Sequence, residues 1–356
     1  MKQILIISTE RHSGKSLLSL AIGRSMQERG FRIAYMKPIS FEVSYVTGEA
    51  MDCDAGSVRD LLGLEDELRD IAPIPLEGPF LREAIESGDR GFRQRITEAH
   101  HRVTQNRDFA IIEGRNYLGL GIGAGLSDLD LADLLSADVL LLCQFDGEEA
   151  IDRILCALRL FENGPSILGV ILKDVPTDRL YATVEEAFVP FLADRGAEVL
   201  GIVPQDPRSR AVCVGDIAKR LGSRVLAPTD LDREVRHFVI GAMGVEASLR
   251  SFRRTPEFAV ITGADRDDIQ RAALTVENLR CLILTGNQRP SREIIAQAAH
   301  HDVAIILAGQ NAMVTARACG EMLERTWIRP GTSLEYAVDH VRSNIDVDRI
   351  LEKATP

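Results

Sequence analysis

The sequence predicts an α/β fold, in which a parallel β-sheet with helices on both faces is followed by a smaller α/β domain. Short, continuous apolar runs alternate with stretches whose apolar residues recur at helical spacing. Such runs are typical of parallel strands that are buried on both faces. Gly30, Gly164 and Gly196 follow helical stretches, as the C-terminal caps of helices do.

The first domain is predicted from apolar runs at Gln3–Ser8, Arg32–Lys37, Phe109–Glu113, Val139–Phe145, Ile167–Leu172 and Glu198–Val203, which are its expected strands. Helical spacing is clear over Lys15–Gln27, Glu149–Phe161 and Leu180–Leu192. A chain of 356 residues is long enough for two domains.

A stretch with two prolines and little apolar content, Pro204–Arg210, marks a domain boundary. We place a first domain at residues 1–205, a second at 206–345 and a C-terminal tail, expected to be frayed, at 346–356. The second domain has expected strands at Phe258–Thr262, Cys281–Thr285 and Val303–Leu307. Its expected helices are Ile269–Leu274, Ser291–Ala299, Asn311–Leu323 and Thr332–Asn344.

The composition favours a cytoplasmic protein that binds neither nucleic acid nor membrane. The formal net charge is −11, whereas non-specific binding to DNA or RNA needs a basic surface. No apolar stretch is long enough to span a bilayer, and the first residues become polar too quickly for a secretory signal. The cysteines form no C-x-x-C pair, which argues against a zinc site.

The segment Ser8-Thr9-Glu10-Arg11-His12-Ser13-Gly14-Lys15-Ser16 follows the first expected strand and opens the first expected helix. Its ending, Gly-Lys-Ser, is the core of a phosphate-binding loop, because glycine lets the backbone approach phosphate oxygens and the helix start attracts the anion. Lys15 can reach the outer phosphates, and the Ser16 hydroxyl can bind Mg²⁺. Thr9 stands where the usual pattern has its first glycine, and a chance tripeptide is the alternative.

A phosphate site needs carboxylates to hold the metal ion or its water shell. Glu113 closes a buried strand, where an ionised carboxylate is costly unless it is paired or binds a metal. The spacing of Asp54 fits a metal ligand and a helix N-cap ahead of Ala55–Leu62 equally well. Lys37, at a strand end, either stabilises an anionic substrate or transferred phosphate, or is an ordinary solvated lysine.

Together these residues resemble the dethiobiotin synthetase-like branch of P-loop proteins, which includes cobyrinic acid a,c-diamide synthases and the N-terminal domain of long phosphotransacetylases. The similar motifs are Ser8–Ser16, Tyr35-Met36-Lys37-Pro38, Asp52-Cys53-Asp54 and Ile111-Ile112-Glu113-Gly114. The resemblance implies a P-loop NTPase-type sheet that binds ATP and Mg²⁺. Lys15 and Lys37 would be catalytic, and Ser16, Asp54 and Glu113 would lie at the metal.

The same resemblance implies where the nucleotide is held. Gly169-Val170-Ile171-Leu172 is similar to a strand that contacts the base, although Lys173 and Asp174 replace the usual asparagine. Gly201-Ile202-Val203-Pro204 is similar to a strand that passes near the base. The implied nucleotide contacts are Thr9, Glu10, His12, Ser13, Gly14, Lys15, Ser16, Leu17, Lys173 and Pro204.

The second domain resembles the DRTGG domain through the turns Gly263-Ala264-Asp265-Arg266 and Thr285-Gly286-Asn287. In a parallel sheet both turns open at the carboxyl edge. One interpretation is that the two turns form a surface that binds an effector or a second copy of the chain in a symmetric homo-oligomer. The other is that they are only structural turns, in which Asp265 caps the next helix. The chain has no room for the acetyl-transferring domain of phosphotransacetylases, so we expect it to be their regulatory part standing alone.

Two other features bear on metal binding and on the choice of substrate. His100-His101 and His300-His301 are poor metal chelates, because adjacent residues of a helix point to different faces. Arg115 is expected to fill the space that holds the substrate in dethiobiotin synthetases, and so to exclude a diamine.

Two functions are compatible with these features. As an enzyme, the chain would use ATP and Mg²⁺ to phosphorylate a carboxylate or carbamate, which an amine then attacks. As a regulatory module, it would bind nucleotide and pass its state to a metabolic enzyme or across a homo-oligomer. We favour regulation, with slow ATP hydrolysis, because the second domain lacks an arrangement of residues typical of nucleophilic catalysis.

Overall fold

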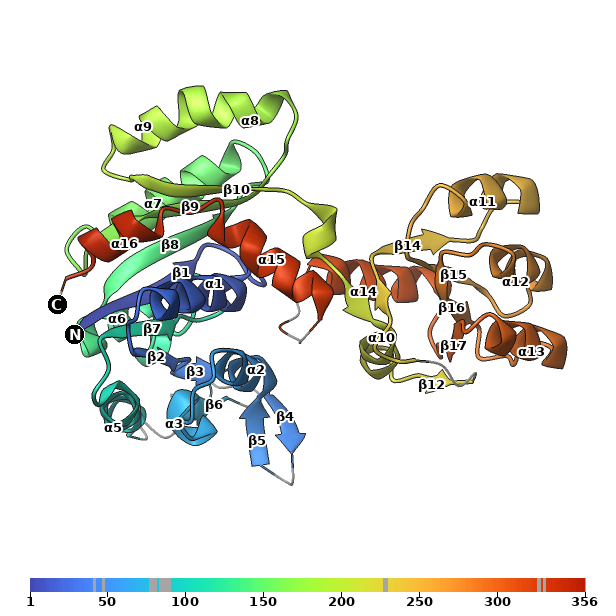
Figure 1. The fold of residues 1–356 in the computed structure, drawn as a ribbon, viewed down its shortest axis with the longest axis horizontal. Coiled ribbons are helices and arrows are strands. Elements are labelled where there is room, and N and C mark those ends of the chain that lie inside the picture. Colours follow the sequence, from blue (N-terminus) through green and yellow to red (C-terminus); the bar gives the residue numbers. More distant parts are fainter. Residues whose placement is uncertain are drawn as a thin grey trace. The chain divides into compact units, whose positions relative to one another are not determined.

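The computed structural model describes residues 1–40, 43–46, 49–76, 82, 91–226, 230–324, 328 and 331–355. The chain divides into two compact units, each of which is visible in Figure 1. Unit 1 comprises Met1–Asp206 and Ile328–Pro356, and unit 2 comprises Pro207–Trp327. Unit 2 is therefore inserted into the chain of unit 1.

Unit 1 is built on a six-stranded sheet with the order β10-β9-β8-β1-β7-β2, in which every neighbouring pair is parallel. Ile4, Leu5, Ile6, Ile7 and Ser8 of β1 are all fully buried. Since successive residues of a strand point to opposite faces, both faces of the sheet are covered, which confirms the predicted fold class. The strands are β1 (Lys2–Ser8), β2 (Ile33–Met36), β7 (Phe109–Glu113), β8 (Asp138–Gln144), β9 (Ile167–Val175) and β10 (Val199–Pro204).

The remaining elements of unit 1 cover this sheet or extend from it. Its helices are α1 (Lys15–Glu28), α2 (Cys53–Leu61), α3 (Leu68–Ile71), α5 (Phe92–Thr104), α6 (Asp128–Leu135), α7 (Glu149–Leu160), α8 (Arg179–Thr183), α9 (Val189–Ala193), α15 (Thr332–Arg342) and α16 (Val347–Lys353). A π-helical segment, η2 (Val184–Phe188), joins α8 to α9, and η1 (Ile122–Ala124) is a 3-10 turn. Two small sheets pair β3 (Ile39–Ser40) with β6 (Ile74–Pro75), and β4 (Val43–Val46) with β5 (Glu49–Asp52).

The C-terminal helices pack on unit 1. Figure 1 shows α15 and α16 in red beside α1 and β10, and α16 also contacts β9. Leu334 and Val338 of α15 and Ile350 of α16 belong to the core around the sheet. The expected second domain at 206–345 and the frayed tail at 346–356 are therefore wrong at this end. An amphipathic pattern predicts that a helix has a buried face, but not which domain covers that face.

Unit 2 holds a five-stranded sheet with the order β12-β17-β16-β15-β14, parallel except for β12. Val260 of β15 lies in one apolar cluster, whereas its neighbours Ala259 and Ile261 lie in another, so both faces are buried. The strands are β12 (Arg224–Val225), β14 (His237–Ile240), β15 (Phe258–Gly263), β16 (Leu279–Thr285) and β17 (Ala304–Leu307), and β11 (Val212–Cys213) pairs with β13 (Glu234–Val235). The helices are α10 (Val214–Arg220), α11 (Val245–Phe252), α12 (Asp267–Leu274), α13 (Arg292–His300), α14 (Ala312–Glu324) and the 3-10 turn η3 (Pro207–Ser209).

Candidate functional site

The carboxyl ends of the six parallel strands of unit 1 meet at one edge of the sheet. The glycine-lysine-serine loop follows β1, Lys37 follows β2, Glu113 ends β7 and Lys173 lies near the end of β9. Ligands of open α/β sheets bind outside this edge. The topology thus collects at one edge residues that are up to 165 positions apart (8 to 173).

The loop between β1 and α1 is shaped to receive an anion. Gly14 has φ +95°, a conformation that suits glycine, and α1 starts with no side-chain cap and no acidic residue in its first turn. The amide groups of that turn are therefore available to a ligand. Ser13 is fully buried, and its hydroxyl has no hydrogen-bond partner among the described residues. A buried polar group without a partner is costly, so this hydroxyl points to a ligand in the loop.

Lys15 lies inside this loop. Its side chain is buried, and Nζ donates a hydrogen bond to the Ser8 hydroxyl at 3.2 Å. Burial lowers the pKa of Lys15, although the nearby carboxylates of Glu113 and Asp128 act in the opposite direction. An anion in the loop would place further negative charge beside the ammonium group of Lys15 and so favour its charged form.

Thr9 and Glu10 hold the loop to the neighbouring strand. The Thr9 hydroxyl contacts the Glu10 carboxylate and the Cys143 thiol of β8. The Glu10 carboxylate also accepts a hydrogen bond from the Gln144 amide and pairs with Arg153. His12 is exposed with φ +53°, and Leu17 is buried in the core. Of these predicted nucleotide contacts, His12 is the one whose side chain faces solvent.

Glu113 is the centre of a buried polar cluster beside the loop. The Ser16 hydroxyl donates to Glu113 Oε1 at 2.8 Å, and the Tyr35 hydroxyl donates to Oε2 at 2.8 Å. Lys37 Nζ lies 3.7 Å from Oε1 of Glu113 and 2.9 Å from Oδ2 of Asp52. Lys37 is mostly buried, so it is not an ordinary solvated lysine.

Electrostatics hold this cluster in its charged form. Burial opposes the ionisation of Lys37, but the carboxylates of Glu113, Asp52 and Asp54 outweigh it and raise the pKa of Lys37. Burial likewise opposes the ionisation of Asp52, but Lys37 and the Ala55 amide keep the pKa of Asp52 below its usual value. The ammonium group therefore lies among three carboxylates.

In the sequence, Asp52 belongs to the motif Asp52-Cys53-Asp54 but has no predicted role, and Asp54 is open between a metal ligand and a helix N-cap. The Asp52 carboxylate accepts a hydrogen bond from the Ala55 amide at 2.8 Å and caps α2. Asp54 lies in the first turn of that helix, so the interpretation of Asp54 as the N-cap is wrong. The signal was present, because a cap residue precedes the first helical residue and Asp52 precedes Cys53.

The oxygen groups around Ser16 fit a magnesium ion. Mg²⁺ prefers oxygen ligands and keeps several waters, so it needs only one or two protein groups in addition to phosphate oxygens. Ser16 and Glu113 already lie within hydrogen-bonding distance of each other, and Asp54 is close enough to act on the charge of Lys37. Within the part of the chain that the structure describes, no three His, Cys, Asp or Glu residues form a metal cluster by themselves.

Lys173 lies across the loop, whereas Pro204 does not. A Cβ atom on Gly14 would lie 3.0 Å from Lys173 Cε and 3.6 Å from Nζ. The Pro204 carbonyl accepts a hydrogen bond from His340 of α15 at 2.8 Å. Of the two residues that were predicted to lie near the base, Lys173 therefore lies beside the phosphate loop and Pro204 lies beside α15.

Arg115 lies in the protein interior. Its side chain is almost fully buried, and Nη1 donates to the Leu126 carbonyl at 2.6 Å. A Cβ atom on Gly121 would clash with the guanidinium, which shows how closely the chain folds around it. The expectation that Arg115 fills a substrate space is therefore wrong, because a guanidinium that packs under a loop cannot repel a diamine.

Asp128 is a second residue that the sequence did not single out. Its carboxylate accepts a hydrogen bond from the Arg115 amide at 2.7 Å, and its other oxygen, Oδ2, has no hydrogen-bond partner among the described residues. Burial raises the pKa of Asp128 to about 6, against the effects of the Arg115 amide and Lys15. No sequence pattern distinguishes it from the other acids at the start of α6.

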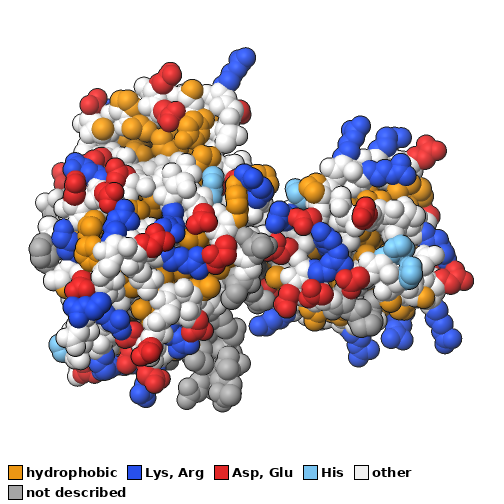
Figure 2. Space-filling model, viewed as in Figure 1, with side chains coloured by type: hydrophobic (Ala, Val, Ile, Leu, Met, Phe, Trp, Pro, Cys, Tyr) orange, Lys and Arg blue, Asp and Glu red, His pale blue; other side chains and the backbone are white. Residues whose placement is uncertain are grey.

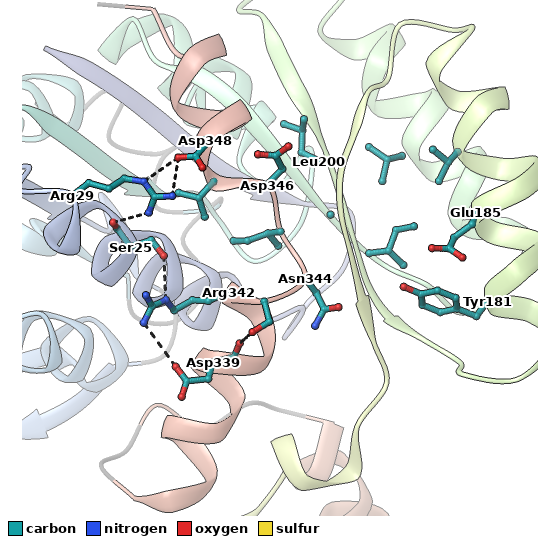
Figure 3. A pocket seen from close by; sticks show the side chains of 17 residues that line it. Ser25, Arg29, Tyr181, Glu185, Leu200, Asp339, Arg342, Asn344, Asp346 and Asp348 are labelled. Atoms are coloured by element: carbon teal, nitrogen blue, oxygen red, sulfur yellow. Dashed lines mark hydrogen bonds and ion pairs between the residues drawn. The ribbon is translucent and has the colours of Figure 1, made fainter.

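A groove of about 1050 Å³ opens elsewhere in unit 1, between β10, α1, α8 and the segment from α15 to α16. Figure 3 shows its two arginines, Arg29 and Arg342, bonded to the acids and serine around them. Gly201 and Ile202 of the strand expected near the base line this groove, but none of the predicted nucleotide, catalytic or metal residues does. We place the candidate site at the loop, because buried polar groups converge there.

The turns of unit 2 also open at the carboxyl edge of its sheet. Arg266 pairs with Asp268 at 2.9 Å and donates to the Met243 carbonyl at 3.2 Å. The start of α12 has no side-chain cap, so the interpretation of Asp265 as its cap is wrong. Four large apolar side chains are exposed near this edge, Ile240, Met243, Met313 and Val314. On the face shown in Figure 2, acidic and basic side chains are interspersed.

A parallel sheet whose first strand runs through a Gly-Lys-Ser loop into a helix defines unit 1 as a P-loop NTPase-like domain. The family model described as an AAA domain matches residues 2–212, and the chain belongs to this family. A second model, the DRTGG domain, matches residues 216–322. The predicted combination of domains is confirmed.

Curated proteins from two groups are similar to the chain. Phosphate acetyltransferase of Pseudomonas putida is 25% identical over 97% of this chain and 51% of its own length. ATP-dependent dethiobiotin synthetase BioD of Methanococcus vannielii is 24% identical over 56% of this chain and 92% of its own length. The chain thus spans about half the length of that acetyltransferase.

Among solved structures, the cell division ATPase MinD of Pyrococcus furiosus is 16% identical, with a TM-score of 0.36 over 58% of this chain and 85% of its own. No helix within the described ranges of the chain is both long and apolar enough to cross a membrane.

Proposed function

We propose that this chain is a cytoplasmic regulatory module that binds ATP and Mg²⁺ and passes the state of its nucleotide site to unit 2. Two features support nucleotide binding, namely the uncapped start of α1 and the buried hydroxyl of Ser13. Lys15 would neutralise the outer phosphates. Ser16, with Glu113 and Asp54, would hold Mg²⁺, which supplies positive charge to the phosphates.

The observation that supports a regulatory function is the insertion of unit 2 into the chain of unit 1. Unit 2 is inserted between β10 and α15, and α15 packs on α1, the helix that starts at the phosphate loop. The Tyr336 hydroxyl of α15 donates to Asp206, where the chain leaves unit 1. Both ends of unit 2 therefore join elements that contact each other, and one of these elements, α15, packs on α1. This gives a change at the loop a structural route to unit 2.

The proposed partners bind at the carboxyl edge of unit 2. Exposed apolar side chains at this edge, with charges of both signs around them, suit a symmetric contact with a second copy of the chain. A metabolic enzyme is the second proposed partner, because the relatives include phosphate acetyltransferases that are about twice as long as this chain.

A second candidate function is an ATP-dependent synthase that activates a carboxylate or carbamate. The position of Lys37 supports it, because this ammonium group lies 3.7 Å from the same carboxylate that accepts the Ser16 hydrogen bond. A lysine at that place could stabilise a transferred phosphoryl group. Its pairing with Asp52 argues for the regulatory function, since the cation is already neutralised.

The first test is nucleotide affinity. Lys15→Ala is expected to weaken binding of ATP with Mg²⁺ by at least about tenfold, or roughly 1.4 kcal/mol, by calorimetry. Lys219→Ala, on an exposed lysine of unit 2, is the control and should bind as the wild type does. Equal affinity for ATP in Lys15→Ala and the wild type would contradict the proposal that the loop binds nucleotide.

The second test separates regulation from synthesis. Hydrogen exchange with and without ATP and Mg²⁺ should show slower exchange in α15 and in unit 2 as well as at the loop. Protection confined to the loop would contradict the regulatory function. Fast phosphate release that depends on an added carboxylate and amine would favour the synthase.

A further inference from the structure

Lys173 packs against the phosphate loop from a strand two positions away in the sheet. It belongs to β9, which is separated from β1 by β8. Its Cδ, Cε and Nζ atoms all lie within 3.6 Å of the place where a Cβ atom on Gly14 would be. Any residue other than glycine at position 14 would thus push against this lysine, in addition to being strained at φ +95°.

The ammonium group of Lys173 is held near the loop instead of extending into water. The residue is 8% exposed, and Nζ donates to Asp174 Oδ2 at 2.7 Å. Asp174 has φ +61°, a conformation that few residues other than glycine, asparagine and aspartate adopt readily. The backbone therefore turns sharply at the residue whose carboxylate neutralises Lys173.

Two other cations near the loop, Lys37 and Arg153, are bound to acids that belong to the site or its frame. Lys37 is shared between Asp52 and Glu113, and Arg153 pairs with Glu10 and Asp146. Lys173 differs, because its acid is its own neighbour in the chain and lies on the same strand. An incoming phosphate can therefore compete for its ammonium group without separating the strands of the sheet.

We propose that Lys173 is a phosphate-binding residue, which exchanges its bond to Asp174 for a bond to the phosphates of a nucleoside di- or triphosphate held in the loop. Asp174 then sets the affinity, because the ammonium must leave the carboxylate before it reaches phosphate. The proposal rests on the proposed nucleotide binding by the loop. It assigns to phosphate a lysine that the sequence places near the base.

The test uses two variants of the full-length protein that break the same ion pair. Lys173→Met is expected to weaken binding of both ATP and ADP, with Mg²⁺, by about fivefold to tenfold in calorimetry. Asp174→Asn is expected to strengthen binding by about twofold to fivefold, because it releases the lysine toward the phosphates. Asparagine tolerates positive φ, so this substitution keeps the turn.

The two variants are expected to change nucleotide affinity in opposite directions, which distinguishes phosphate binding by Lys173 from a merely structural ion pair. A structural pair would weaken binding in both variants, and that result, or an unchanged affinity in Lys173→Met, would overturn the proposal. If Lys173→Met does not fold by circular dichroism, the sign of the change in Asp174→Asn decides alone. Wild-type protein that binds neither nucleotide, or Lys15→Ala that binds both normally, would instead refute the nucleotide site itself.

Discussion

The Glu113 carboxylate contacts the side chains of Ser16, Tyr35 and Lys37. Because glutamine has nearly the same shape, a substitution can test the role of the negative charge alone. Glutamine at this position can still accept from Ser16 or Tyr35, but it carries no charge for Mg²⁺ or Lys37. Glu113→Gln is expected to reduce the gain in ATP affinity on adding Mg²⁺ by about fivefold or more, with little loss of affinity in the absence of metal.

The measurement is calorimetry with ATP in EDTA and in Mg²⁺. Glu162→Gln, on an exposed acid of unit 1, serves as the control. An undiminished effect of Mg²⁺ in Glu113→Gln would exclude this residue from the metal site.

Asp128 predicts a dependence of stability on pH. Burial raises the pKa of Asp128 from 3.8 to about 6. Between pH 4 and 6 the folded state keeps a proton that the unfolded state has lost, so the free energy of unfolding falls as the pH rises through this range. Above pH 6 the cost of the buried charge is constant at about 3 kcal/mol, since a tenfold change in proton affinity is worth about 1.4 kcal/mol.

Asp128→Asn should therefore stabilise unit 1 at pH 8 by up to about 3 kcal/mol and have little effect near pH 4. Its carbonyl oxygen can still accept from the Arg115 amide. Thermal melts at several pH values provide the measurement, and Asp133→Asn, on an exposed acid of the same helix, is the control. A stabilisation that does not change with pH would contradict the assignment.

Among single residues, the sequence predicted those of the phosphate loop and the carboxylate of Glu113. Both lie where a buried apolar run ends, and this position can be recognised in the sequence. From the sequence, Asp52 received no role of its own, Asp128 was not singled out, and Arg115 was placed in the wrong surroundings. The burial of Arg115 depends on how residues 121 to 126 fold over it. Such packing is a property of the tertiary structure and leaves no local pattern.

The edge strand β10 is covered by the segment that joins α15 to α16. Ile345 forms an antiparallel bridge with Gly201, and the Asp346 amide donates to the Leu200 carbonyl at 2.7 Å. A Cβ atom on Gly201 would lie 2.7 Å from the Asn344 carbonyl and 3.0 Å from Ile345 Cα. The absence of a side chain at position 201 lets the two backbones meet.

Gly201→Ala is therefore expected to displace this segment and to destabilise unit 1 by about 1–3 kcal/mol. The Asp346 amide should lose protection in hydrogen exchange, while the centre of the sheet keeps it. Gly320→Ala, in helix α14 with open space around it, is the control and should be neutral or slightly stabilising. Equal protection of Asp346 in Gly201→Ala and the wild type would show that the close contact is not needed.

The sequence predicted the six strands of the first sheet, whose apolar runs are continuous, and the helix that became α15. It did not predict β14, since His237–Ile240 is short and less apolar than its neighbours. It also gave no means of assigning α15 to unit 1, because Leu334 and Val338 would suit either core. Which core a buried face joins is decided by contacts between distant parts of the chain.

The proposed self-association is tested on the whole chain. Ile240 is 52% exposed at the carboxyl edge of unit 2, and Ile122 is 62% exposed in unit 1. If the edge of unit 2 forms a symmetric contact, Ile240→Glu should lower the molar mass of the full-length protein in light scattering to that of a monomer of 39.2 kDa. Ile122→Glu is the matched control and should keep the wild-type mass.

A monomeric wild type at micromolar concentration would contradict self-association through this edge. The effector surface would then be tested separately, by screening ligands against the wild type and Arg266→Ala.

The insertion of unit 2 also sets the order in which the chain can fold during synthesis. Residues 207–327 are contiguous, so unit 2 can complete its core before α15 and α16 are synthesised. Unit 1 cannot complete its core at that point, because Val338, Val341 and Ile350 are synthesised after unit 2. Until they emerge, β10 presents an uncovered edge and its apolar neighbours to the solvent, which is the condition under which strands from different chains pair. The nascent protein therefore has a defined interval of vulnerability to aggregation, which ends when α15 and α16 dock on unit 1.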